Sequence, residues 1–158
     1  MYFRSAPLSA LIKIDSTTGD IIWILGGEGD EFNLTEEQQM SYQHFPYFFD
    51  ENTITVFDNG NDYEQTRILE YVLDEETKTL TSFTAYEIED WYASAMGSAL
   101  RLSADEPLYL VCWGQVDSNG ILFSEINFET GEVLFQLMDI TSTSDYFVAS
   151  YRVYKFDS

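Results

Sequence analysis

The sequence of 158 residues predicts an all-β protein, and more narrowly a section of a β-propeller that forms a single domain over residues 1–158. Two observations carry this prediction. Tyr, Phe, Thr, Val and Ile recur in short alternating runs that Gly, Asp, Asn and Ser turns interrupt, which is typical of strands. In addition, one hairpin pattern returns at a long interval, which is typical of a repeat fold.

Each alternating run is expected to form one strand, and the connections between runs are expected to be turns. The one segment with a helical signature is residues 35–39, where Thr35 can cap a short turn and Gln38 can answer three residues later. The predicted strands are residues 8–15, 20–25, 43–49, 53–58, 66–73, 79–87, 96–102, 107–113, 120–127, 131–138 and 147–156.

The repeated hairpin consists of a strand, an acidic turn with Thr followed by Gly or Lys, and a second strand. It occurs at residues 14–21, 73–80 and 126–133, so its interval of about 50 to 60 residues matches one four-stranded propeller blade. A β-sandwich also has turns about every 8 to 12 residues, but it has no reason to repeat one hairpin at this longer interval.

The repeat predicts two full blades at about residues 43–87 and 96–138, a partial blade at 1–27 and a final strand at 147–156. A propeller closes its ring with about four to eight blades, so the chain corresponds to a section of a ring. Because blades bury their faces against one another, we expect the open ends to pack with the missing propeller blades or with a second copy of the chain.

The chain is strongly acidic, with 7 Lys and Arg against 28 Asp and Glu and a net charge of -21. This charge repels phosphate backbones and anionic lipids, which argues against nucleic acid and membrane surfaces as partners. No apolar run approaches about 18 residues and the N-terminus lacks a charged and then apolar pattern, so neither a membrane span nor a signal peptide is expected. The single Cys112 is expected to be a buried thiol, which leaves the cellular compartment open.

The only histidine, His44, and the nearby Arg67 are the candidates for a site that binds an anionic group. The two residues stand among strand-like runs, with a turn at residues 58–62 between them in the sequence. Plainer interpretations exist, because a lone histidine is often a packing or surface residue and Arg67 could be the cross-strand partner of Glu64 or Glu70. The turn is rich in oxygen atoms but lacks the glutamate spacing of a calcium loop, so we expect a tight turn and no metal site.

Five segments resemble, in the same order, the C-terminal half of bacterial aryl-sulfate sulfotransferases: SALIKIDSTTGDIIWILGGEGDEF, SYQHFPYFFDENTITVFDNG, TRILEYVLDEETKTL, DWYASAMGSALRL and LYLVCWG. The combination of QH, FDNG and an arginine before LEY is the most specific part. The resemblance implies a six-bladed propeller enzyme that moves a sulfuryl group from a phenolic sulfate ester to a phenol through a sulfated histidine, with no nucleotide donor or other cofactor. It also implies a periplasmic or extracellular location.

The resemblance also implies roles for individual residues. The histidine that follows glutamine is the family's nucleophile, which implies that His44 carries the sulfuryl group. The arginine before LEY implies that Arg67 binds the sulfate, and the FDNG turn implies that Asn59 lies near the ligand. Arg4 matches an arginine that some members carry near the first strand, whereas the next residue, Ser5, departs from their pattern.

Two functions are compatible with these features. The first is an aryl-sulfate sulfotransferase, or its C-terminal part, in which His44 and Arg67 project from neighbouring strands towards one rim and share a sulfate. The second is a non-catalytic propeller section that acts as a binding or scaffold module, because the chain has one histidine in total and no general acid unless a phenol such as Tyr42 or Tyr92 substitutes. Upstream blades with further histidines would favour the enzyme.

Overall fold

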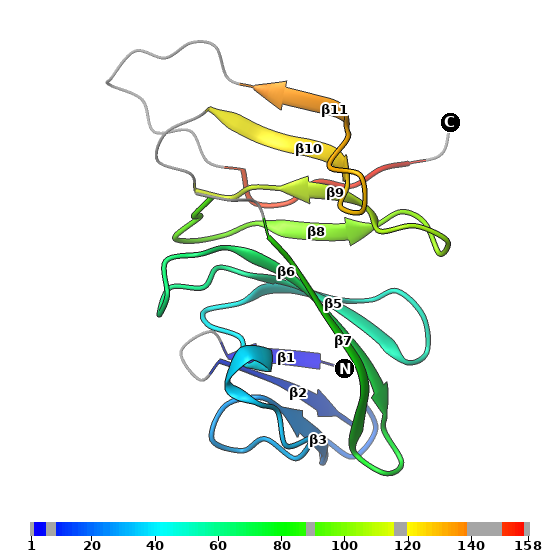
Figure 1. Cartoon of the computed structure of the whole chain (residues 1–158). Helices are drawn as coiled ribbons and strands as arrows, with labels where there is room; N and C mark the ends of the chain where they lie inside the picture. The colour runs from blue at the N-terminus through cyan, green and yellow to red at the C-terminus, as the bar shows by residue number, and fades with distance from the viewer. Residues whose placement is uncertain (1, 6–8, 88–90, 116–119, 139–149, 157–158) are drawn as a thin grey trace.

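The computed structural model describes residues 2–5, 9–87, 91–115, 120–138 and 150–156, with the backbone alone for residues 2–5. Over these residues, eleven strands form three open antiparallel sheets, stacked in chain order in Figure 1. Sheet I contains β1 (Tyr2–Ser5), β2 (Ala10–Ile14) and β3 (Ile21–Leu25). Sheet II contains β4 (His44–Phe48), β5 (Thr53–Asp58), β6 (Arg67–Asp74) and β7 (Thr79–Glu87). Sheet III contains β8 (Ser98–Arg101), β9 (Leu108–Cys112), β10 (Ile121–Asn127) and β11 (Val133–Met138).

The all-β prediction is confirmed. Sheets II and III coincide with the predicted ranges 43–87 and 96–138, and within each sheet the strands follow one another in chain order. A short 3-10 helix, η2 (Glu36–Gln38), occupies the predicted helical turn. There the Thr35 N–H donates to the side-chain oxygen of Gln38 at 2.9 Å, as the sequence indicated.

Two segments differ from the prediction. β1 was not expected from the sequence, because four residues are too few for their alternation to stand out. The final strand predicted at 147–156 is wrong for residues 150–156, which form no strand, whereas residues 147–149 lie outside the described part. The Ser150 N–H donates to the carbonyl of the loop residue Gly114 at 3.4 Å, so this backbone does not join a strand ladder there.

The repeated hairpin has the same hydrogen bonds in each of its three copies. A side-chain oxygen at the start of the turn accepts the backbone N–H groups two and three residues further on, which is an Asx turn. The acceptors are Asp15, Asp74 and Asn127, and the bonds measure 2.7 to 3.2 Å. These backbone bonds lower the pKa of Asp15 and of Asp74.

We expect the double variant Asp15→Asn, Asp74→Asn to lose less stability in acid than the wild type. A lowered folded-state pKa means that the stabilisation is present above the ordinary value of 3.8 and is lost as the pH falls through the lowered pKa. An amide accepts the same N–H groups without titrating, as Asn127 does in the third hairpin. Urea unfolding between about pH 5 and pH 2 measures this dependence, and equal slopes in the two proteins would contradict the assignment.

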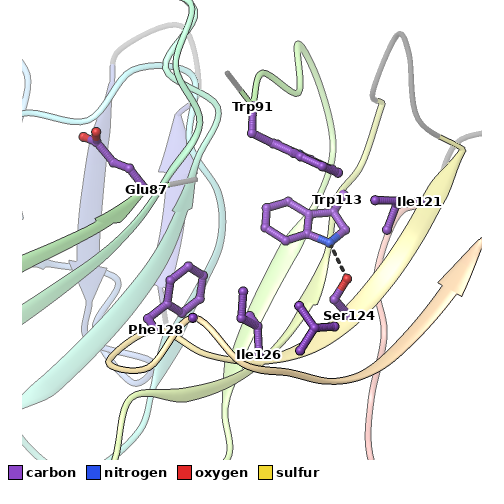
Figure 2. A pocket seen from close by; sticks show the side chains of 9 residues that line it. Glu87, Trp91, Trp113, Ile121, Ser124, Ile126 and Phe128 are labelled. Atoms are coloured by element: carbon purple, nitrogen blue, oxygen red, sulfur yellow. Dashed lines mark hydrogen bonds between the residues drawn. The ribbon is translucent and has the colours of Figure 1, made fainter. Parts of the chain in front are cut away.

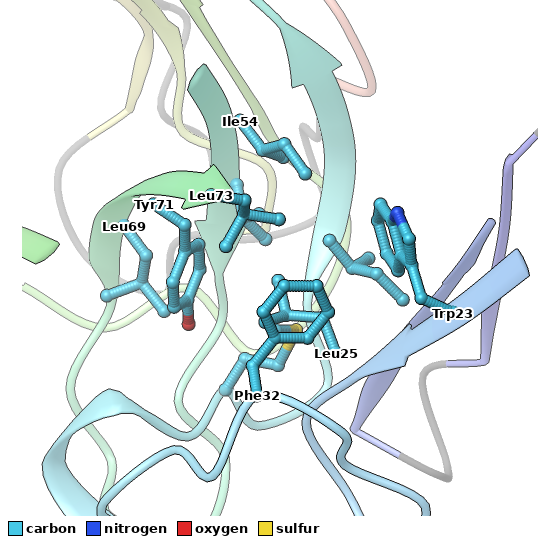
Figure 3. Packing of buried hydrophobic residues seen from close by; sticks show 10 residues of the cluster. Trp23, Leu25, Phe32, Ile54, Leu69, Tyr71 and Leu73 are labelled. Carbon is cyan, nitrogen blue, oxygen red and sulfur yellow. The ribbon is translucent and has the colours of Figure 1, made fainter. Parts of the chain in front are cut away.

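Two apolar cores hold the sheets together. The first lies between sheets I and II and is closed by the loop that follows β3 (Figure 3); it contains Leu11, Trp23, Leu25, Phe32, Met40, Ile54, Val56, Leu69, Tyr71 and Leu73. The second lies between sheets II and III and contains Phe57, Ile68, Ala93, Ala99, Tyr109, Val111, Trp113 and Ile126. Sheet II is therefore covered on both faces, which explains why all six residues of β5 are buried.

Glu70 forms a polar link between sheets II and III. Its carboxylate accepts a hydrogen bond from the Tyr109 hydroxyl at 2.6 Å and pairs with Arg101 at 2.8 Å. Burial, followed by the bond to Glu70, raises the pKa of Tyr109. The arginine and tyrosine of sheet III thus satisfy a carboxylate of sheet II inside the contact between the two sheets.

Candidate active site

His44 opens β4 and lies opposite Phe57 of β5. The pairing register shifts between His44 and Tyr47, which is a β-bulge. Two residues near the histidine have positive φ angles, 55° at Tyr42 and 48° at Phe45. Bulky residues seldom adopt this backbone conformation, and bulges and strained residues concentrate where a functional side chain must be aimed.

The chain that leads into His44 is fixed from two directions. The buried side chain of Gln43 donates to the Ala10 carbonyl of β2 at 2.8 Å. The Ser41 N–H donates to the Asp58 carboxylate at 2.7 Å, and the Ser41 carbonyl accepts the Gly60 N–H at 2.9 Å. These bonds give Gln43 and the FDNG turn a structural role, because both hold the backbone that leads into His44.

Asn59 determines which nitrogen of His44 carries the proton. The Asn59 amide nitrogen donates to the carbonyls of Ala93 at 2.7 Å and Met96 at 3.0 Å, so its oxygen faces the histidine. That oxygen lies 2.7 Å from His44 Nδ1, and the Tyr42 carbonyl lies 3.1 Å from the same nitrogen. Both oxygens are acceptors, so Nδ1 must be the N–H donor. In the neutral ring, the lone pair is then on Nε2.

The loop that receives Asn59 is itself bonded to the FDNG turn. The Ala93 N–H donates to the Thr66 hydroxyl at 2.8 Å, and this hydroxyl donates to the Asn59 carbonyl at 3.3 Å. Gly97 lets the loop pass close to sheet II, because its φ is 101° and a Cβ there would lie 2.3 Å from the Phe57 ring. The orientation of His44 therefore depends on contacts between residues more than 30 positions apart.

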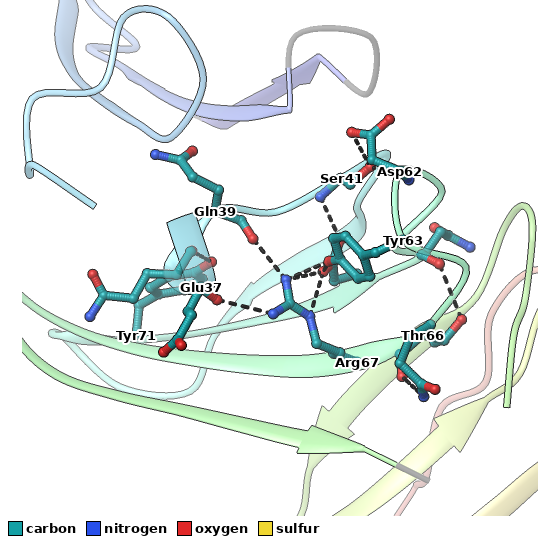
Figure 4. Close-up of polar contacts among 12 residues, drawn as sticks. Glu37, Gln39, Ser41, Asp62, Tyr63, Thr66, Arg67 and Tyr71 are labelled. Atoms are coloured by element: carbon teal, nitrogen blue, oxygen red, sulfur yellow. Dashed lines mark hydrogen bonds and ion pairs between the residues drawn. The ribbon is translucent and has the colours of Figure 1, made fainter. Parts of the chain in front are cut away.

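Arg67 is engaged with Asp58 and the backbone around η2 (Figure 4). Its Nε and Nη2 donate to one Asp58 oxygen at 3.1 and 2.8 Å. Nη1 donates to the Glu37 carbonyl at 3.0 Å and Nη2 to the Gln39 carbonyl at 2.8 Å. The Tyr63 hydroxyl contacts both members of the ion pair, and its ring lies 4.5 Å from the Arg67 Cζ. Most of the guanidinium's donors are thus occupied by the protein itself.

The pKa values in this cluster are governed by burial and by the ion pair. Burial raises the pKa of Asp58, although Tyr63, Ser41 and Arg67 all act in the opposite direction. Burial also raises the pKa of Tyr63, and the neighbouring Asp58 raises it further. Burial by itself would lower the pKa of Arg67, but Asp58 outweighs this and raises it. The positive charge of Arg67 is therefore balanced within the fold.

The structure brings Asn59 and His44 into contact, whereas Arg67 pairs with Asp58. Arg67 lies opposite Asp58 in the β5–β6 ladder, whereas His44 lies opposite Phe57. The hydrogen bonds of Arg67 go to Asp58, Tyr63 and the carbonyls of Glu37 and Gln39, so a shared sulfate between His44 and Arg67 stays a prediction. Neither Glu64 nor Glu70 is the partner of Arg67, since Asp58 takes that place. Arg4 lies in β1 opposite Leu11, and its side chain lies outside the described part.

A pocket of about 360 Å³ lies between the end of β7 and sheet III (Figure 2). The indole rings of Trp91 and Trp113 form part of its wall with their centroids 4.6 Å apart, and the Trp113 N–H donates to the Ser124 hydroxyl at 3.0 Å. Its walls are largely apolar and suit an aromatic ring. His44 is not among the residues that line this pocket.

The partners that fix the candidate site were missed from the sequence. Asp58 and Tyr63 are the contacts of Arg67, and the carbonyls of Ala93 and Met96 orient Asn59. The FDNG motif was a signal for Asp58, but a backbone carbonyl carries no sequence signal. Across the described residues, no cluster of three or more His, Cys, Asp or Glu could hold a metal ion, and no helix is long and apolar enough to cross a membrane.

The fold and the site define an all-β protein in which one histidine is held with Nδ1 as donor and Nε2 as lone-pair nitrogen, the form that suits nucleophilic group transfer. The sequence model of the arylsulfotransferase (ASST) family matches residues 5–152. The chain therefore belongs to the arylsulfotransferase family, which supports a function of that type. Comparisons with curated proteins and with solved structures found no match.

Proposed function

We propose that this chain transfers a sulfuryl group from a phenolic sulfate ester to a phenol, with His44 as the covalent carrier. The observation that carries the proposal is the contact between Asn59 Oδ1 and His44 Nδ1 at 2.7 Å, which leaves the ring's lone pair on Nε2. Family membership supports the substrate class and a location outside the cytoplasm. Nothing in the described part favours the non-catalytic alternative.

The proposed reaction has two displacement steps. In the first, the Nε2 lone pair attacks sulfur, an N–S bond forms, and the bond between sulfur and the aryl oxygen breaks to release a phenolate, which takes up a proton from water. In the second, the oxygen of another phenol, which gives its proton to water, attacks sulfur, and the N–S bond breaks with its electron pair returning to Nε2. The second step thus regenerates the histidine, which can then react with another aryl sulfate.

Asn59 supports the first step electrostatically. When Nε2 bonds to sulfur, the ring becomes positively charged and its Nδ1–H becomes a stronger donor. The hydrogen bonds to Asn59 Oδ1 and the Tyr42 carbonyl therefore strengthen as the transition state develops. Such a differential interaction accelerates the chemical step, whereas equal binding of substrate and transition state would not.

We expect Asn59→Leu to reduce kcat about 10- to 100-fold, because a hydrogen bond to a charged group contributes about 1.5 to 3 kcal/mol. KM for the aryl sulfate should change far less, since Asn59 acts on the ring. Steady-state kinetics with a chromogenic aryl sulfate measures both constants. Tyr109→Phe is the matched control, because it removes another buried hydrogen bond and should keep kcat. An unchanged kcat in Asn59→Leu would remove the basis of the proposal.

We also propose that the three sheets are consecutive parts of a β-propeller. The family resemblance implies that the complete propeller has six blades. Sheets II and III support this proposal, because each has four strands that lie side by side in chain order. Each of the three sheets also contains one Asx hairpin. On this proposal residues 1–158 are a single domain, with residues 43–87 and 96–138 as blades and residues 1–27 as a partial blade.

The exposed apolar side chains of β11 support the proposal that further blades, or a second copy of the chain, pack against sheet III. This outer strand exposes five large apolar side chains by 41 to 56%: Val133, Leu134, Phe135, Leu137 and Met138. Blades bury such surface against their neighbours.

A further inference from the structure

Most of the positively charged side chains that the structure describes are paired with carboxylates. Among the described side chains, five cations form ion pairs, and these are Lys13–Glu75, Arg67–Asp58, Lys78–Glu31, Arg101–Glu70 and Lys155–Glu125. Arg4 is not among the described side chains. The remaining cation, Arg152, has no carboxylate partner within the described part and instead contacts aromatic rings.

Arg152 contacts the residue that follows the candidate nucleophile in the chain. Its Cζ is 5.4 Å from the ring centroid of Phe45, the residue that directly follows His44, and 5.0 Å from that of Tyr151. The edge of Tyr154 packs on the same Phe45 ring, with centroids 6.1 Å apart. The C-terminal segment thus places a guanidinium and an aromatic ring against Phe45, the residue next to the histidine.

The C-terminal segment, red in Figure 1, is fixed where it crosses sheet III. The Ser150 hydroxyl donates to the Leu122 carbonyl at 2.8 Å, and the Val153 N–H donates to the Ser98 hydroxyl at 3.4 Å. Arg152 lies between these two attachment points. Its position next to Phe45 therefore follows from contacts of its own segment with β8 and with the start of β10.

We propose that Arg152 binds the sulfate group of the aryl sulfate as it reacts at His44. This inference rests on the proposed function and supplies the cation that Arg67 does not. A guanidinium offers a planar fork of N–H donors that matches two sulfate oxygens. Stacking on Phe45 and Tyr151 orients the group without neutralising it, whereas recruiting Arg67 would require breaking its buried ion pair.

Binding of inorganic sulfate to the complete protein tests this inference without catalysis. A titration at constant ionic strength, followed by NMR or calorimetry, should show saturable binding in the wild type and binding about 10- to 100-fold weaker in Arg152→Gln. Arg152→Lys keeps the charge but loses the fork, so it should fall between the two. Lys155→Gln, in the same segment but paired with Glu125, should bind sulfate like the wild type.

The His44→Ala variant separates failure of this inference from failure of the proposed function. If it still binds sulfate and Arg152→Gln does not, the anion site stands whatever the activity of His44→Ala is. Under turnover, Arg152→Gln should raise KM for the aryl sulfate by the same factor, with circular dichroism confirming that the fold is intact. Wild-type protein without saturable sulfate binding, or Arg152→Gln binding as tightly as the wild type, would overturn the inference.

Discussion

His44→Ala should reduce release of phenol from an aryl sulfate to the uncatalysed rate. The substitution removes the atom that we propose forms the bond to sulfur, and the sequence contains no second histidine to replace it. The neighbouring Asn59 would keep its bonds to the Ala93 and Met96 carbonyls, so the site should retain its shape. The measurement is the initial rate of phenol release by the complete protein.

Chemical rescue serves as the control for His44→Ala. Added imidazole can occupy the space left by the side chain and provide a nitrogen lone pair, so part of the activity should return with increasing imidazole. The same additive should not accelerate the wild type. Full activity in His44→Ala without imidazole would reject the assignment of the nucleophile.

Arg67→Ala should have the largest effect on stability. It leaves the fully buried Asp58 carboxylate without its cation and should lower the free energy of unfolding by about 3 to 5 kcal/mol. For a chain of this size, the melting temperature should fall by about 10 °C. Urea unfolding and thermal melting measure the two quantities.

The matched control for Arg67→Ala is Lys78→Ala. Lys78 pairs with Glu31 at the surface, where both side chains are more than a third exposed, and such pairs contribute at most about 1 kcal/mol. If the two substitutions destabilise the protein equally, the buried pair does not have the structural role assigned to it. A stable Arg67→Ala protein that loses sulfate binding would restore the sequence-based interpretation of Arg67 as a sulfate ligand.

Local patterns predicted most of the strands. The three hairpins were recognisable because Asp15, Asp74 and Asn127 each close the turn through bonds to the next few residues, so the whole cause lies within a short stretch of sequence. β1 was not predicted because it is short. Residues 150–156 were predicted to form part of a strand, but their described backbone N–H groups donate to a loop carbonyl and to a side chain.

The candidate site was only half predictable. His44 and Asn59 were identified through residues that stand close together in the sequence, and the structure brings them into contact. The orientation of Asn59 depends on backbone carbonyls 34 and 37 positions away, which no side-chain pattern reveals. For Arg67, the ion-pair partner was misjudged because it depends on strand register: Arg67 lies opposite Asp58 in the β5–β6 ladder and pairs with it, not with Glu64 or Glu70.

The most direct test of the account is peptide mass spectrometry of the complete wild-type protein after incubation with an aryl sulfate and an alkaline quench. We predict a sulfuryl adduct on the peptide that contains His44, removal of the adduct when excess phenol acceptor is added before the quench, and no adduct in His44→Ala. An active enzyme with no adduct, or with its adduct on a different residue, would contradict the proposal that His44 carries the sulfuryl group.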